Sequence, residues 1–212
     1  ALQAGEVDFI RNPPRSQVAA LQADTNLNVQ VSAATWVDWF RINMDKPPLD
    51  DLRVRLAIAH ALNRDAANKR ALFGLGTPSL TNVPPLSNVP LDINAPEYNP
   101  DKARALLKEA GAEGFELELM AHDVAHIAKT AESYAAALQA IGINAVAKAT
   151  EDGLWIERWV DRDFQMANSA SISFMDPDPR SRGIGSKDNT GYVNPKITEL
   201  LDKGSALSDP IE

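Results

Sequence analysis

The segment 47–66, PPLDDLRVRLAIAHALNRDA, carries the clearest structural signal in the chain. Its two prolines disfavour helix just upstream, and Asp50 or Asp51 then stands where a helix N-cap is expected. The pattern predicts one long amphipathic helix, because apolar residues recur at helical spacing after the cap. These residues are Leu52, Leu56, Ala59 and Leu62, with Ile58 beside them.

The composition limits the classes of function that the chain can have. With 21 Lys and Arg against 29 Asp and Glu, the 212 residues carry a net charge of −8. This charge argues against nucleic acid as the main partner, because a phosphate backbone requires a basic surface. The sequence has no cysteine, which excludes a disulfide framework, a Cys-ligated zinc site and a thiol nucleophile. No apolar run approaches the ~18 residues of a membrane span.

The rest of the chain predicts an α/β fold. Residues 99–111 form a second expected helix, since Asn99 can cap it, Pro100 suits its first turn and Gly111 follows its last. A strand at 115–120, a helix at about 124–141 and a strand at 143–149 then make a β-α-β unit, for which parallel pairing is expected. The other expected elements are short strands at 6–10 and 28–32, a strand within 35–44, a helix at 151–161, strands at 164–167 and 171–174, and a helix at 194–204.

No arrangement of side chains predicts catalysis. His122 and His126 have the i, i+4 spacing of two metal ligands on a helix, but that helix is expected to begin near Val124. A serine nucleophile on a Gly-x-Ser-x-Gly elbow is absent from the sequence. Glu116 and Glu118 suit a solvated strand face better than an acid–base pair. We therefore expect a protein that is not an enzyme and has neither a cofactor nor a metal site.

Two segments resemble known family signatures. The stretch around 43–66 is similar to the signature of family 5 extracellular solute-binding proteins of ABC transporters, the oligopeptide-, dipeptide- and nickel-binding type. The segment 98–120, YNPDKARALLKEAGAEGFELELM, resembles a second signature of that family. The residues that carry the first resemblance are Asn43, Pro47, Pro48, Asp50, Asp51, Arg53, Val54, Arg55, Ala57, Ala61, Asn63, Arg64 and Asp65.

The resemblance implies a fold and a domain organisation. The expected fold is a periplasmic-binding-protein-like lobe of the class II, cluster C type, with a mixed, mostly parallel sheet flanked by helices. Residues 1–212 are then expected to form most of the C-terminal lobe of a two-lobed protein, with the N-terminal lobe and the C-terminal tail absent from the sequence.

The resemblance also implies a function in ABC import. The expected role is the substrate-binding component, which captures a small solute, a peptide or a peptide-like compound, between two lobes and delivers it to a membrane permease. The expected partners are that ligand and the permease subunits, with no nucleic acid and with membrane contact only through the permease. The expected location is the periplasm, or the extracellular side with a membrane anchor in a bacterium with a single membrane.

Two alternatives stay open at this point. One is an α/β hydrolase-type enzyme domain with acid–base residues in the segment 171–178. The other is a family member that binds a metal chelate, an opine or a sugar.

The candidate ligand-binding residues lie at two aromatic positions and in one polar segment. Trp39 and Trp155 fall where family members carry aromatic side chains near the ligand. The segment 168–180, NSASISFMDPDPR, offers small polar groups and an apolar wall. In peptide binders the Asp that pairs with the ligand's amino terminus falls on Met175, and Asp176 is one position away from it. The candidates in this segment are Ser171, Ser173, Phe174, Met175 and Asp176.

Overall fold

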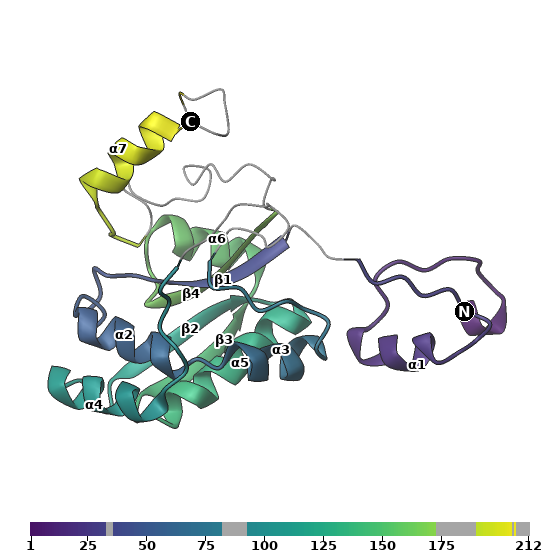
Figure 1. The fold of residues 1–212 in the computed structure, drawn as a ribbon, viewed down its shortest axis with the longest axis horizontal. Helices are drawn as coiled ribbons and strands as arrows, with labels where there is room; N and C mark the ends of the chain where they lie inside the picture. Colours follow the sequence, from purple (N-terminus) through teal and green to yellow (C-terminus); the bar gives the residue numbers. More distant parts are fainter. Residues whose placement is uncertain (33–35, 82–92, 173–189, 205, 207–212) are drawn as a thin grey trace.

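The computed structural model describes residues 1–32, 36–81, 93–172, 190–204 and 206 (Figure 1). Helices and strands alternate over much of this chain, as the sequence predicts for an α/β fold. In chain order the elements are η1 (Leu2–Ala4), η2 (Arg15–Gln17), α1 (Val18–Gln22), β1 (Trp36–Ile42), α2 (Leu52–Ala61), α3 (Arg64–Leu72), α4 (Pro100–Ala110), β2 (Glu116–His122), α5 (Ala125–Gln139), β3 (Asn144–Thr150), α6 (Asp152–Val160), β4 (Met166–Ile172) and α7 (Pro195–Gly204).

The strands form one mixed sheet in the order β1-β4-β2-β3. Strand β2 pairs in parallel with β3 and with β4, while β1 pairs antiparallel with β4. The parallel pairing expected for the β-α-β unit of β2, α5 and β3 is therefore confirmed. So is the mixed, mostly parallel sheet that the resemblance implies.

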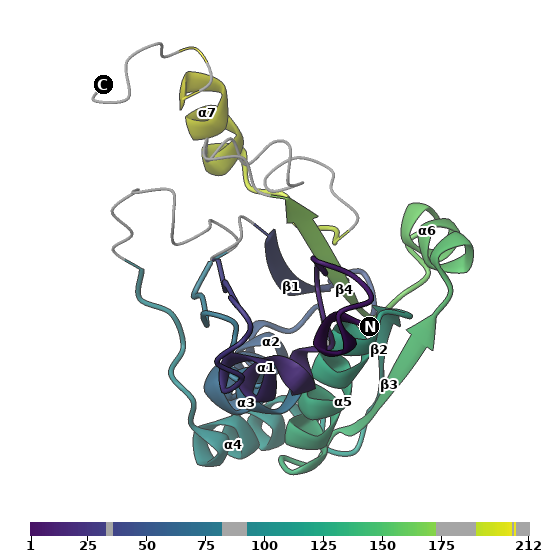
Figure 2. The ribbon, with the colours of Figure 1, turned by 90° about the vertical axis from the view of Figure 1, so that its right-hand side faces the viewer.

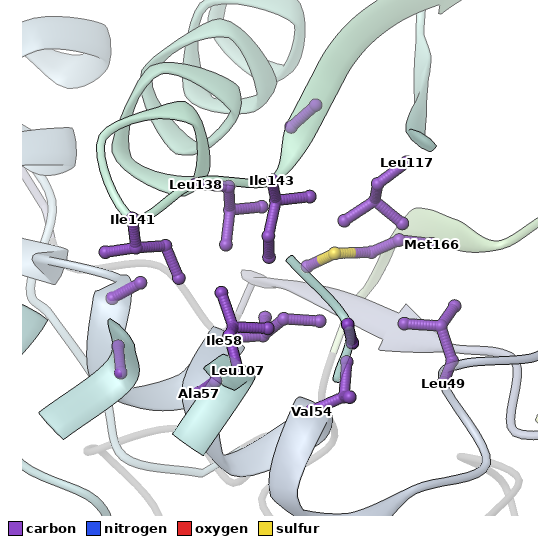
Figure 3. Packing of buried hydrophobic residues seen from close by; sticks show 14 of the residues in the cluster. Leu49, Val54, Ala57, Ile58, Leu107, Leu117, Leu138, Ile141, Ile143 and Met166 are labelled. Carbon is purple, nitrogen blue, oxygen red and sulfur yellow. The ribbon is translucent and has the colours of Figure 1, made fainter. Parts of the chain in front are cut away.

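Helices cover both faces of this sheet. Figures 1 and 2 show α2, α3, α4 and α5 on one side and α6 on the other. Because side chains alternate along a strand, Leu119 and Met166 join the main core, whereas Met120 and Ala167 join a smaller core beneath α6. The main core also contains Leu49, Val54, Ile58, Leu107, Leu117, Leu138 and Ile143 (Figure 3).

The segment 47–66 differs from its prediction in two ways. The helix ends at Ala61, and Asn63 starts a second helix by accepting a hydrogen bond from the Ala66 backbone N–H at 2.9 Å. The predicted apolar stripe is only partly correct, since Ile58 is buried and Leu62 packs against the core, but Leu52 is 59% exposed. The face of α2 that packs into the core consists of Val54, Ala57, Ile58 and Ala61.

A buried asparagine at the end of β1 forms hydrogen bonds to the residues that precede β4. Asn43 is 1% exposed, and its side-chain N–H groups donate to the carbonyls of Arg162 and Phe164, both at 3.0 Å. Its side-chain oxygen accepts from the Asp45 backbone N–H at 3.1 Å. Because these hydrogen bonds replace water around buried backbone groups, Asn43 fixes the turn that precedes the segment 47–66.

The first 32 residues contain short helices only. The strands expected at 6–10 and 28–32 do not form, so this prediction was wrong. Both segments are largely exposed and have no neighbouring strand to pair with in the described part of the chain. Among the described residues, no helix has both the length and the apolar character needed to cross a bilayer.

Candidate functional site

The carboxyl ends of the parallel strands meet at one edge of the sheet. His122 ends β2, Thr150 ends β3 and Ile172 ends β4, and Trp36, the first residue of β1, pairs with Ile172 at the same edge. In Figure 2 the arrowheads of β3 and β4 point toward this edge. Ligands of open α/β sheets bind outside the carboxyl ends of the strands, so this edge is the candidate functional site.

The predicted polar segment begins at this edge. Ser171 lies in β4 and pairs with Val37 of β1. The other candidates of the segment, Ser173, Phe174, Met175 and Asp176, lie outside the described residues. Their role as ligand contacts therefore stays a prediction.

Trp155 belongs to a stack of rings on the α6 face of the sheet, which we call the aromatic stack. The ring of Trp155 lies 4.1 Å from that of His122 and 5.0 Å from that of Trp159, and Trp159 lies 5.0 Å from Phe164. The interplanar angles are 24°, 12° and 7°, so the rings are nearly parallel. Trp155 is 7% exposed, and its indole Nε1 has no hydrogen-bond partner among the described residues. Its predicted contact with a ligand is untested.

Trp39 lies near the same stack. The guanidinium carbon of Arg41 sits 5.8 Å from the Trp39 ring centre and 5.4 Å from the Trp159 ring centre. Cation–π contacts of this kind attract the guanidinium to the faces of both rings. The half-buried Trp39 of β1 is thereby connected through Arg41 to the ring system that contains Trp155.

His122 makes an interaction that the sequence did not predict. Its Nδ1 lies 2.8 Å from a carboxylate oxygen of Asp152, in the first turn of α6. The backbone N–H of Asp123 donates to the Thr150 carbonyl at 3.0 Å, which joins the ends of β2 and β3. The side chain of His122 is 23% exposed, so this imidazole is both oriented and reachable from the edge of the sheet.

His126, the other histidine of the predicted pair, lies in the first turn of α5. Its Nε2 is 3.8 Å from a carboxylate oxygen of Asp38 in β1, and Asp38 also accepts a hydrogen bond from the Trp36 indole at 3.0 Å. Within residues 1–32, 36–81, 93–172, 190–204 and 206, no three His, Asp or Glu residues come together as a metal site.

The pKa of His126 is expected to make stability depend on pH. Burial lowers this pKa below its ordinary value of 6.5, the positive charge of Arg15 lowers it further, and Asp38 opposes the change. The unfolded chain therefore binds the proton first as the pH falls, and the contribution of His126 to stability, complete above about pH 6.5, is lost below it. We expect the urea midpoint to fall less between about pH 7.5 and about pH 5.5 in H126N than in the wild type. Equal losses in the two proteins would contradict this.

Two grooves lie away from the carboxyl edge. One of about 440 Å³ is formed by the N-terminal helices and the end of α3, and the other, of about 350 Å³, lies near the amino end of β4. In the second groove, Arg158 pairs with Glu118 at 2.7 Å and Lys46 with Asp163 at 3.8 Å, so its main charges are neutralised. Neither groove contains a predicted ligand-binding residue.

Comparisons with known proteins all identify relatives that are solute-binding proteins. The model of the bacterial extracellular solute-binding proteins, family 5 (middle part), matches residues 1–192. Among curated proteins, the dipeptide-binding protein of Escherichia coli K12 is 32% identical over 171 residues, which are 77% of this chain and 32% of that protein. The glutathione-binding protein GsiB of E. coli O1:K1 is 33% identical over 154 residues, 72% of this chain and 30% of that protein.

Solved structures share the fold over the whole chain. The periplasmic binding protein DppA of Helicobacter pylori, in complex with the peptide STSA, superposes with a TM-score of 0.83 and 27% identity over 99% of this chain and 43% of that one. CtaP of Listeria monocytogenes superposes with a TM-score of 0.86 at 19% identity, over 100% of this chain and 45% of that one. The chain thus spans about a third of the curated relatives and less than half of the solved structures.

Proposed function

Because the chain belongs to the bacterial extracellular solute-binding proteins, family 5, we propose that it forms most of one lobe of a two-lobed receptor for an ABC importer. The family match over residues 1–192 is the observation that carries this proposal. The candidate site supports it, since the carboxyl edge of the sheet offers aromatic rings and polar groups to a small ligand. The family and its structural neighbours are binding proteins, and we assign this chain a binding role without catalysis.

The solute of this proposal is a peptide or a peptide-like compound. The supporting observations are a dipeptide-binding relative and a glutathione-binding relative, each more than 30% identical, and a similar structure at 27% identity in complex with the peptide STSA. The residues assigned to the ligand cleft are Trp39, Trp155 and Ser171, together with Ser173, Phe174, Met175 and Asp176.

The proposed receptor works outside the cytoplasmic membrane. The name of the family describes its members as extracellular, which favours a periplasmic or extracellular location. The solute closes the two lobes on itself, and the closed form then delivers it to the permease subunits.

Native mass spectrometry of the full-length protein, purified without refolding, tests the proposal. We expect a discrete added mass that dissociates intact and fragments as a peptide or a peptide conjugate. A ligand-free mass, together with conversion of dipeptides to products, would reject the receptor and favour the hydrolase-type alternative.

A further inference from the structure

One polar atom at the candidate site, the Nε2 of His122, is held in place but has no hydrogen-bond partner among the described residues. The Nδ1 of His122 is held by Asp152 at 2.8 Å, and the ring is fixed against Trp155 at 4.1 Å. Its Nε2 makes no hydrogen bond to any described residue. A carboxylate on Nδ1 sets the tautomer of a neutral imidazole, so that Nδ1 carries the proton and Nε2 offers its lone pair.

The charge that touches the His122 ring is negative, since a carboxylate oxygen of Asp152 lies 2.8 Å from its Nδ1. Asp123 follows His122, and Glu151 precedes Asp152 in the chain. No Lys or Arg of the described residues pairs with any of these three carboxylates. Glu151 caps α6 by accepting from the backbone N–H groups of Gly153 and Leu154, whereas Asp152 is oriented on the histidine and stays 70% exposed. An acceptor nitrogen on a ring whose other nitrogen is held by a carboxylate favours a positively charged donor over an anion.

A second polar atom, in the ring beside it, also has no hydrogen-bond partner in the described part of the chain. This atom is the indole Nε1 of Trp155, which is buried in a residue that is 7% exposed. A buried N–H without an acceptor is costly, and most such groups in native proteins are satisfied. Because the Trp155 N–H is closed off from solvent while the His122 side chain is 23% exposed, the polar contact that this part of the aromatic stack presents to a ligand is His122.

We propose that His122, oriented by Asp152, receives an amino group of the solute at the carboxyl edge of the sheet. This inference rests on the proposed function and names His122 and Asp152 as the groups that recognise the amino group of the solute. The amine donates to Nε2 of His122, and the negative charge of Asp152 on the other ring nitrogen stabilises the positive charge of the amine.

The test compares free and N-acetylated dipeptides on the full-length protein. A mixed dipeptide library identifies the dipeptide retained most strongly, and calorimetry then measures the dissociation constants of that dipeptide and of its N-acetyl form. We expect the wild type to bind the free form at least about tenfold more tightly. H122F retains a planar ring on Trp155 but has no nitrogen, and D152N removes the charge behind the ring. Both are expected to lose this preference.

The control variant is E157Q, which removes an exposed charge from the same helix without touching His122. It should keep the preference of the wild type. Addition of the retained dipeptide should shift the nitrogen-15 resonance of the His122 Nε2 in the wild type, a change that a purely structural role would not produce.

Three results would overturn the inference. Equal binding of the free and acetylated forms by the wild type, or a full preference for the free form in a folded H122F, would reject the role of His122 and leave the proposed function intact. Binding of neither form by the wild type would reject both the inference and the peptide class of the proposed function.

Discussion

Replacing Leu107 by Ala is expected to lower the free energy of unfolding of the chain by about 3 kcal/mol. Leu107 lies on α4 with 0% exposure, and it packs in the main core with Val54 and Ile58 of α2 and Leu138 of α5 (Figure 3). The substitution removes buried apolar surface and leaves a cavity between helices that the sheet holds in place, so relaxation can fill it only in part. Urea unfolding followed by tryptophan fluorescence measures the loss.

The matched control is L52A, a change of the same size at the start of α2. Leu52 is 59% exposed, so its removal is expected to cost less than about 1 kcal/mol. If L52A were as destabilising as L107A, the assignment of the buried face of α2 would be wrong. The pair of variants therefore tests the packing of α2 against α4 directly.

Helices whose ends are set by nearby capping residues could be predicted from the sequence. For α4, the side chain of Asn99 accepts from the Lys102 backbone N–H at 3.0 Å, Pro100 is the first helical residue and Gly111 ends the helix with φ 64°. Each of these features depends on chemistry within a few residues of the helix end. Apolar residues at helical spacing also identify its buried face from the sequence, since Ala103 and Leu107 are buried while Leu106 and Ala110 pack at the margin of the core.

The buried face of α2 could not be predicted from the sequence in the same way. Both of its sides carry apolar residues at helical spacing, so periodicity alone does not decide between Leu52 and Leu56 on one side and Val54 and Ile58 on the other. The choice depends on α4 and on the sheet, which are distant in the sequence. The break before Asn63 was missed because Leu62 fits the helical pattern, while the Asn63 cap is a local signal that could have revealed it.

The candidate site was predictable only in part. A resemblance indicated Trp39, Trp155 and the segment that starts near Ser171, but the pairing of His122 with Asp152 joins residues 30 positions apart. Only the parallel pairing of β2 with β3 places the start of α6 beside the end of β2. A sequence pattern alone does not predict such a contact.

A single lobe is expected to bind the solute at least about a hundredfold more weakly than the two-lobed protein, because ligand pockets remove most of the ligand's surface from water and one lobe supplies only one wall. The polar groups of the carboxyl edge, such as His122, stay in contact with water when no second wall covers them. Their hydrogen bonds to a ligand then replace equally good ones to water and contribute little.

Calorimetric titration of the retained dipeptide into the full-length protein and into residues 1–212 alone tests the central claim, that the solute is held between two lobes of which this chain forms one. The account predicts a dissociation constant of about a micromolar or tighter for the full-length protein and a value at least about a hundredfold larger for the chain alone. Equal affinities would contradict it, because the whole binding site would then lie within these 212 residues.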